Sequence, residues 1–436
     1  MRTIYNILFN LFFALSAPFY FWKMWRRGNW RSNFQQRFGK YDGKLKQALT
    51  NRHILWMHAV SVGEVNLCTQ LIRTLETELP NMKIVVSTTT TTGMGELNKH
   101  LPSQITRIYY PIDRRKHVQR AMGTIHPEAV VLIEAEIWPN FLWSLQRRRI
   151  PYFLVNARLS NRSFRGYRRF GFLFRPLFAG FAGVSAQNEE DAARLRELGV
   201  RPEVIEVVGS LKYDAAKVDE RRVLDVPLML NQVGAPQNPI LIVGGSTHSG
   251  EELILAEIVR RLRPAIPKLF LVIVPRHQER GNEVGRELSA KGFRPLFRTE
   301  ITPSTRKEPG EIDCLIINTT GELRYFYQHA DIVFVGKSLT AEGGQNPIEP
   351  AALGKAVIFG PHMSNFAQIV PEFLKHKGAL QVENAAELES AIASLAQDPK
   401  RRSQLGQQAL HVVEANRGSL HRTVDMIVNA MPEEYH

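Results

Sequence analysis

Short runs of β-forming residues alternate with helix-forming stretches and glycine loops along most of the chain, and this alternation constrains the fold most strongly. We predict strands at residues 54–60, 84–88, 129–134, 152–155 and 205–208, and in a second series at 240–243, 269–274, 314–317, 332–335 and 357–359. Strands that alternate with helices form parallel, doubly wound sheets. The sequence therefore predicts an α/β protein with two Rossmann-like halves that face a cleft, with ligands at the carboxyl ends of the strands.

The length of 436 residues favours two domains, because one hydrophobic core rarely organises so long a chain. We expect an N-terminal segment at 1–25, a first domain at 26–216, a linker rich in proline at 217–239 and a second domain with closing helices at 240–436. The two cysteines, Cys68 and Cys314, are far apart in sequence. They exclude a disulfide framework or a zinc ribbon.

The net charge of +14 is concentrated in two stretches. Residues 23–46 contain eight Lys or Arg and one acid, and residues 147–175 contain nine Arg and no acid. The rest of the chain is close to neutral. This distribution predicts two surfaces that face an anionic partner, and it argues against a general nucleic-acid binder.

Residues 4–25 are apolar over roughly the 20 residues that cross a bilayer, although Asn6, Asn10, Pro18 and Lys23 interrupt them. We interpret the segment as a retained membrane anchor, since aromatic residues continue past the place where a signal peptide would be cleaved. The basic residues that follow predict a body on the cytoplasmic side, and Trp22, Trp25 and Trp30 suit the headgroup region. Whether the segment spans the membrane or lies in its plane stays open.

Residues 161–181 form the second basic patch, in which Arg162, Arg165 and Arg169 share one helical face. Neighbouring aromatic residues supply a wide apolar surface: Phe164, Tyr167, Phe170, Phe172 and Phe174. The patch is either a solvated arginine face over a packed core or a surface for anionic lipid. No RNA-binding motif supports a role with RNA.

Carboxylates follow two strands of the first half. Ser61 and Glu64 form the pattern of a capping box, but a carboxylate on a turn at the end of a strand could also accept a proton from a hydroxyl. Glu134 and Glu136 end the strand at 129–134, and alternation places both on one face of an extended strand. Buried carboxylates need compensation, and Lys212 after the last strand is a plausible partner.

In the second half, polar or glycine loops follow the strands. Ser246, Thr247 and His248 precede a helix whose N–H groups favour a phosphate, and Arg276 offers a bidentate cation. Glu349 could accept ribose hydroxyls or offset a helix dipole. Together these loops indicate a nucleotide. The chain has no GxxxxGK[ST], GxGxxG, HExxH or GxSxG motif, so a P-loop NTPase, a dinucleotide oxidoreductase, a tight metal site and a serine hydrolase are not supported.

Eight motifs resemble, in order and spacing, those of the 3-deoxy-D-manno-octulosonic acid (Kdo) transferases of lipopolysaccharide assembly. They are SVGE at 61–64, EAEIWPN at 134–140, NARLS at 156–160, QNEED at 187–191, GSLK at 209–212, PRH at 275–277, GEL at 321–323 and NPIEP at 346–350. The resemblance covers nearly the whole chain. Ala135 stands where the family usually has Thr, which affects the hydrogen bonding expected of the flanking glutamates.

The resemblance implies a GT-B glycosyltransferase that transfers Kdo from CMP-Kdo to the anionic lipid A precursor at the cytoplasmic face of the inner membrane, with inversion and without metal or cofactor. It implies that Glu64 is the general base and that Glu134 and Lys212 stabilise the transition state. CMP would be held by Pro275, Arg276, Gly321, Glu322, Leu323, Asn346, Pro347, Ile348 and Glu349. We add the expectation that Arg162, Arg165, Arg168 and Arg169 receive the lipid headgroup.

Two alternatives remain open at this stage. One is a GT-B transferase that uses another nucleotide sugar, such as a UDP-hexosamine. The other is a non-catalytic, anchored module that binds anionic lipid or RNA and shows no nucleotide dependence.

Overall fold

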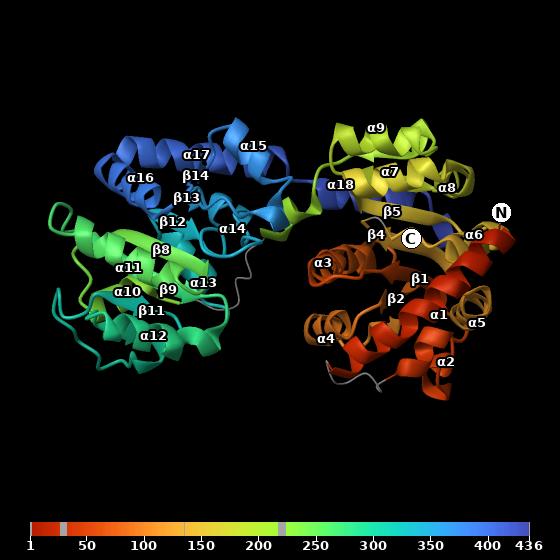
Figure 1. Cartoon of the computed structure of the whole chain (residues 1–436), viewed down its shortest axis with the longest axis horizontal. Coiled ribbons are helices and arrows are strands. Elements are labelled where there is room, and N and C mark those ends of the chain that lie inside the picture. The colour runs from red at the N-terminus through yellow and green to blue at the C-terminus, as the bar shows by residue number, and fades with distance from the viewer. Residues whose placement is uncertain (1, 27–32, 135, 217–223, 436) are drawn as a thin grey trace. The chain divides into compact units, whose positions relative to one another are not determined.

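A computed structural model describes residues 2–26, 33–134, 136–216 and 224–435. The chain divides into two compact units, of which the first comprises Met1–Ala215 with Arg417–His436 and the second Ala216–Asn416. Each unit is a seven-stranded, wholly parallel sheet with helices on it (Figure 1). The predicted α/β class with two Rossmann-like halves is confirmed.

The first unit has the strand order β3-β2-β1-β4-β5-β6-β7. Its strands are β1 (His53–His58), β2 (Met82–Thr88), β3 (Thr106–Tyr109), β4 (Pro127–Ile133), β5 (Tyr152–Ala157), β6 (Gly183–Ala186) and β7 (Ile205–Val207). Its helices are α1 (Arg2–Arg26), α2 (Gly43–Leu49), α3 (Val62–Glu78), α4 (Thr91–His100), α5 (Arg115–Ile125), α6 (Pro139–Arg148), α7 (Asn161–Arg169), α8 (Gly171–Phe178), α9 (Glu189–Glu197) and α18 (Ser419–Asn429).

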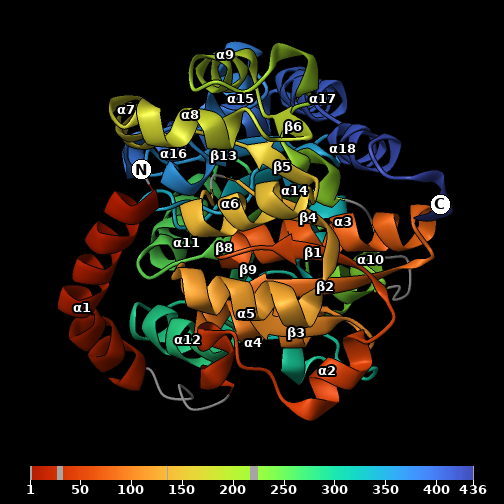
Figure 2. The same ribbon diagram turned by 90° about the vertical axis from the view of Figure 1, so that its right-hand side faces the viewer.

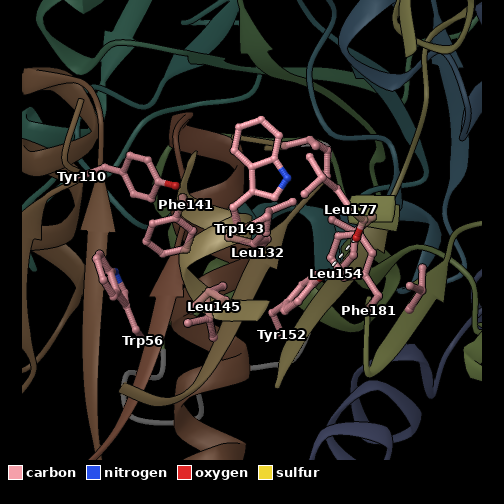
Figure 3. Packing of buried hydrophobic residues seen from close by; sticks show 14 of the residues in the cluster. Trp56, Tyr110, Leu132, Phe141, Trp143, Leu145, Tyr152, Leu154, Leu177 and Phe181 are labelled. Carbon is pink, nitrogen blue, oxygen red and sulfur yellow. Dashed lines mark hydrogen bonds between the residues drawn. The ribbon is translucent and has the colours of Figure 1, made fainter. Parts of the chain in front are cut away.

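Both faces of this sheet are buried, because successive residues of its central strands enter two different cores. On β1, Ile54 and Trp56 join one core, and Leu55 and Met57 join the other. Figure 3 shows the first core, where the Trp56 ring meets Phe141 of α6 edge to face at 5.0 Å. The second core contains residues of α3, α4 and α18. Helix α18 thus completes the first unit although it ends the chain.

The second unit is also wholly parallel but has a different strand order, β10-β11-β9-β8-β12-β13-β14, in which β11 lies between β10 and β9. Its strands are β8 (Ile240–Thr247), β9 (Leu269–Pro275), β10 (Pro295–Phe297), β11 (Cys314–Ile316), β12 (Ile332–Val335), β13 (Ala356–Phe359) and β14 (Leu380–Gln381). Its helices are α10 (Val226–Gln232), α11 (Glu251–Leu262), α12 (Gly281–Ala290), α13 (Leu323–His329), α14 (Ile348–Ala351), α15 (Val370–Lys375), α16 (Ala385–Gln397) and α17 (Pro399–Ala415).

All ten predicted strands are present. The sequence analysis missed β3, β6, β10 and β14, which have two to four residues each. Strands this short carry few apolar positions, and they form because a neighbouring strand offers its hydrogen-bonding edge. The equally short β7 and β11 were predicted because the β-forming runs 205–208 and 314–317 extend beyond them.

The predicted domain boundaries differ from the two observed units at the C-terminus and in the linker. The expected second domain reached residue 436, whereas Arg417–His436 lies in the first unit. In the expected linker, residues 217–223 lie outside the described part, and α10 occupies Val226–Gln232 within the second unit.

The expected membrane segment forms α1, whose residues Ile4, Leu8, Leu11 and Leu15 are well exposed. Trp22 and Trp25 are exposed as well. Met1 and Trp30 lie outside the described residues. Within the part of the chain that the structure describes, no helix has the length and apolar character needed to cross a membrane.

Candidate functional site

The strand order of the first unit reverses between β1 and β4, and the carboxyl ends of these two strands carry the predicted carboxylates. Glu64 lies in the first turn of α3, directly after β1, and Glu134 directly follows β4. Ligands of open α/β sheets bind at such a reversal, outside the carboxyl ends of the strands. The topology therefore places Glu64 and Glu134 where this fold binds its ligands.

Glu64 is 7 % exposed and takes part in a capping box. Its backbone N–H donates to Ser61 Oγ at 3.2 Å, and its Oε2 accepts from the Val60 N–H at 2.7 Å. Burial raises the pKa of Glu64, the hydrogen bonds to Val60 and Ser61 lower it, and nearby Glu136 raises it. The capping role is thus real, but a carboxylate has about four lone-pair sites and remains able to accept a proton.

Glu134 does not continue the strand as predicted. Its φ is 62°, in the left-handed region, while its N–H still donates to Val155 O at 3.0 Å. The expectation that Glu134 and Glu136 lie on one face of an extended strand is therefore wrong, because the left-handed residue ends the alternation. Ala135 lies outside the described residues. A non-glycine residue in this region costs about 1–3 kcal/mol and persists only where its surroundings hold it.

The three carboxylates are electrostatically coupled. Burial raises the pKa of Glu134, Glu64 raises it further, and Lys212 and Arg158 lower it. Burial also raises the pKa of Glu136, with a contribution from Glu134, although Trp138 Nε1 donates to its Oε2 at 2.9 Å. The fold thus gathers three carboxylates whose protons are held more tightly than in water.

Lys212 comes from a segment that follows β7, three strands away from β4 in the sheet order. Asn156 brings this segment back, because its Oδ1 accepts from the Leu211 N–H at 3.2 Å. Burial lowers the pKa of Lys212, and Glu134 raises it. The predicted pairing of Glu134 with Lys212 is therefore present as an electrostatic interaction.

Two residues of this site were quoted in a motif but given no role. Asn156 is fully buried, has a φ of 53° and holds the Lys212 segment. Arg158 lowers the pKa of both Glu134 and Lys212, so its positive charge lies near both. Their position in the sequence could have identified them, because both follow the predicted strand 152–155, which pairs with β4. Asn is also a residue that tolerates a left-handed conformation.

In the second unit, the residues predicted to bind a nucleotide end or follow four neighbouring strands, β11-β9-β8-β12. The loop at Gly321, Glu322 and Leu323 comes after β11, and Pro275 ends β9 with Arg276 next to it. Ser246 and Thr247 end β8, followed by His248, and Asn346 to Glu349 come after β12. One edge of the sheet thus carries all the predicted nucleotide-binding residues.

A buried glutamate ties two of these loops together. Oε2 of Glu251 accepts from the N–H groups of His248 at 2.8 Å and Lys337 at 2.7 Å. Its Oε1 accepts from Ser338 at 2.9 Å and Leu339 at 3.0 Å. Glu251 therefore fixes the end of β8 to the end of β12, where the order of this sheet reverses.

Several predicted nucleotide-binding side chains are already engaged within the protein. Thr247 Oγ1 donates to Glu252 at 3.0 Å, and Glu322 Oε2 accepts from Arg298 Nε at 3.0 Å. Oε1 of Glu349 accepts from Asn346 Nδ2 at 3.0 Å. We therefore expect Thr247 and Glu322 to serve a ligand through their backbone, whereas Glu349 keeps lone pairs for hydroxyl donors.

The four arginines of the predicted headgroup surface lie on α7 and are exposed. The Arg168 and Arg169 guanidinium groups lie over the Phe164 and Phe170 rings, at 5.4 and 5.9 Å. Phe164 packs against the first core, whereas Phe170 is 49 % exposed. The segment thus has an arginine face above a packed core, as in the first of the two expectations, and an exposed aromatic ring beside it.

Among the described residues, no group of three or more His, Cys, Asp or Glu side chains is arranged to hold a metal ion.

A family model described as 3-deoxy-D-manno-octulosonic-acid transferase matches residues 32–215. The 3-deoxy-D-manno-octulosonic acid transferase of Haemophilus influenzae is 34 % identical over 86 % of this chain and 86 % of its own length. That of Bordetella pertussis is 31 % identical over 94 % and 96 %. A solved glycosyltransferase from Rickettsia africae covers 88 % of this chain and 100 % of its own, with a TM-score of 0.54 and 15 % identity, and shows the fold alone.

Proposed function

The chain belongs to the 3-deoxy-D-manno-octulosonic acid (Kdo) transferase family, with the two-domain GT-B fold of a glycosyltransferase, and we propose that it transfers Kdo from CMP-Kdo to the lipid A precursor. A hydroxyl oxygen of the acceptor attacks the anomeric carbon of Kdo. The bond from this carbon to the phosphate oxygen breaks, and CMP leaves with the electron pair. A single displacement of this kind inverts the anomeric configuration.

Glu64 accepts the proton of the acceptor hydroxyl in this proposal. Its raised pKa makes it a stronger base than an exposed glutamate, and the capping box holds the carboxylate in one orientation. A base must lie within hydrogen-bond reach of the proton that it takes, and a first-turn position after β1 suits this requirement. The coupling of Glu64 to Glu134 and Glu136 supports a shared role at one reacting centre.

Glu134 and Lys212 hold the charges of the transition state. As the bond to phosphate breaks, positive charge develops on the sugar and negative charge on the leaving phosphate. A fixed carboxylate stabilises the first, and a fixed ammonium stabilises the second or the carboxylate of Kdo. Asn156 is a positioning residue, because it holds the segment that carries Lys212.

The nucleotide is proposed to lie at the carboxyl edge of the second sheet. Arg276 would contact the phosphate, the loops at Gly321 to Leu323 and Ser246 to His248 would offer backbone N–H groups, and Glu349 would accept ribose hydroxyls. Pro275, Asn346, Pro347 and Ile348 would complete the CMP site. The location of these residues at or after the ends of four adjacent strands supports this assignment.

The acceptor headgroup is proposed to meet Arg162, Arg165, Arg168 and Arg169 at the cytoplasmic face of the inner membrane. Four exposed cations beside exposed aromatic rings suit a phosphorylated lipid in the interface. We propose that α1 lies in the membrane plane, with its exposed apolar residues in the lipid. Reversing two charges, Arg165→Glu with Arg169→Glu, is expected to raise the KM for the lipid acceptor in mixed micelles and to leave the KM for CMP-Kdo unchanged.

The observation that carries the proposed function is the cluster of three carboxylates, Glu64, Glu134 and Glu136, where the strand order of the first sheet reverses, in a chain of this family. The test is mass spectrometry of the lipid A precursor after incubation with purified protein and a CMP-Kdo generating system. We expect a gain of one or more Kdo masses, with CMP but not UDP as an inhibitor and no effect of EDTA. Protection by UDP alone, with no Kdo gain, would instead indicate another nucleotide sugar.

A further inference from the structure

The first unit contains a cavity of about 980 Å³ outside the carboxylate site. The residues that line it belong to α1, to the segment Arg114 to Gln119 at the start of α5, and to α6. Figure 2 labels these three helices in the first unit. Glu64, Glu134, Glu136 and Lys212 do not line it. The proposed function therefore leaves this cavity without a role.

The walls of the cavity are strongly basic. Among the described residues that line it, none is a carboxylate and six have cationic side chains: Arg2, Arg114, Arg115, Lys116, Arg147 and Arg148. Arg115, Lys116, Arg147 and Arg148 form no ion pair with any residue that the structure describes. Cations gathered in a concave site without counterions attract an anion from solution.

Two of the cations are held in place by the protein. The Arg2 guanidinium lies over the Trp143 ring at 5.3 Å. Arg114 Nε donates to Asn10 Oδ1 at 2.6 Å, and its guanidinium lies over Phe13 at 5.4 Å. Cations fixed in this way lose little conformational freedom when they bind a ligand.

The nearest carboxylate is engaged elsewhere. Asp113 Oδ1 accepts from the Phe141 N–H at 2.9 Å, and its Oδ2 accepts from Tyr5 Oη at 2.8 Å and the Asn140 N–H at 3.0 Å. Asp113 thus joins α1 to the start of α6. It pairs with none of the cavity cations that the structure describes.

A histidine in the wall of the cavity, His117, lies among positive charges. The pKa of His117 is lowered to about 4, first by burial and then by Arg114, Arg120, Lys116 and Lys40. All four of these neighbours are cations, so positive charge here exceeds what nearby groups neutralise. An anion in the cavity would relieve this repulsion.

The two sides of α1 indicate what kind of anion fits. Arg2, Asn6 and Asn10 line the cavity, while Ile7 and Leu11, on the neighbouring side of the same helix, are 62 % and 58 % exposed. A ligand with its charged group in the cavity would have an apolar surface directly beside it. This arrangement suits an amphiphile, whose anionic head enters the cavity and whose chains lie along α1.

We propose that this cavity binds the phosphate-bearing headgroup of an anionic membrane phospholipid that the enzyme does not consume. The site is separate from the acceptor surface on α7 and goes beyond the proposed transfer reaction. A bound headgroup would hold α1 against α5 and α6 and fix the orientation of the first unit on the membrane.

The test compares lipid binding by the full-length protein and by the variant Lys116→Gln, Arg147→Gln, Arg148→Gln. These three side chains are exposed and outside the core, so the variant is expected to fold. Native mass spectrometry with phosphatidylglycerol in detergent is expected to show one retained lipid per wild-type chain and at least a tenfold lower fraction in the variant. The matched control, Arg52→Gln with Arg73→Gln and Lys99→Gln, removes the same charge at exposed positions elsewhere on this unit and is expected to keep the lipid.

Three results would overturn the proposal. One is equal lipid retention by wild type and variant. Another is the same thermal stabilisation by inorganic phosphate as by phosphatidylglycerol, which would make the site one for free phosphate. The third is a raised KM for the lipid acceptor in the variant, which would make the cavity part of the acceptor site. Because lipid retention is measured without donor or acceptor, failure of the transfer reaction would leave this test interpretable.

Discussion

Glu64 has both a structural and a proposed catalytic role, and one pair of substitutions separates them. Glu64→Gln keeps an oxygen that can accept the Val60 N–H, so the capping box survives. It removes the charge and the proton-accepting capacity. General bases contribute about 10²–10⁴-fold to rate, which corresponds to about 3–5 kcal/mol of transition-state stabilisation. We expect the transfer rate to fall by this factor, while the free energy of unfolding stays unchanged or rises because a buried charge is lost.

Ser61→Ala is the matched control. It removes the hydroxyl that caps α3 and leaves the Glu64 carboxylate in place. Loss of such a cap costs about 0.5–2 kcal/mol of stability, and we expect little change in the transfer rate. The assay combines single-turnover mass spectrometry of the lipid product with urea unfolding. If Glu64→Gln transferred Kdo within an order of magnitude of the wild-type rate, the assignment of the base would be refuted.

The pH dependence of the wild-type rate follows from the same residue. Burial raises the pKa of Glu64, so its carboxylate is already protonated at a pH where an exposed glutamate would be charged. A protonated carboxyl cannot accept the hydroxyl proton. We expect kcat/KM to fall as the pH decreases through this raised pKa, and the acidic limb to disappear in Glu64→Gln, whose residual rate should be flat in this range.

Three further predictions concern the neighbours of Glu64 and the second unit. Lys212→Met removes the cation that lowers the pKa of Glu134, so kinetic titration should place the protonation of Glu134 at a higher pH. Lys212→Arg keeps the charge and should keep the wild-type pH profile. A wild-type profile in the Met variant would contradict the pairing of Lys212 with Glu134. Glu136→Gln should raise the free energy of unfolding at pH 8 but not at pH 4. Burial raises the pKa of this carboxyl group, so it binds its proton more tightly in the folded state and destabilises the fold only where it is ionised. Equal effects in urea unfolding at the two pH values would contradict this. Gly245→Ala should destabilise the second unit by about 1–3 kcal/mol and weaken CMP binding in calorimetry, because the added Cβ would lie 1.8 Å from the Tyr327 hydroxyl oxygen. An unchanged melting temperature would show instead that Tyr327 can move away.

The sequence predicted the features that repeat along the chain. Parallel strands buried on both faces read as apolar runs, so ten of the strands and the two sheets were recognisable. Once the runs were in place, the residues after them had to lie at the carboxyl edge of a sheet. This step made Glu64, Glu134 and the nucleotide loops candidates, and the resemblance to the Kdo transferases supplied their expected roles.

Features that depend on tertiary contacts could not be predicted in the same way. The left-handed φ of Glu134 is imposed by its surroundings. Strand alternation therefore wrongly predicted that the side chains of Glu134 and Glu136 lie on one face of an extended strand. Lys212 lies near Glu134 in a segment after β7 that Asn156 helps to hold, through a hydrogen bond between residues 55 positions apart. The cavity beside α1 unites residues 2–10 with residues 114–119 and 140–148, and no local pattern links them.

The two units offer a comparison that bears on the role of Glu64. Each sheet reverses its strand order beside its first strand, and each places a glutamate in the first turn of the helix that follows that strand. Glu251 of the second unit accepts four backbone N–H groups, so its lone pairs are used and its charge is compensated. Glu64 accepts from the Val60 N–H through Oε2, is also hydrogen-bonded to Ser61, and lies near two other carboxylates. Shifted pKa values gather at functional sites, so this difference between the two glutamates supports the proposal that Glu64 takes the proton, and the Glu64→Gln variant tests it.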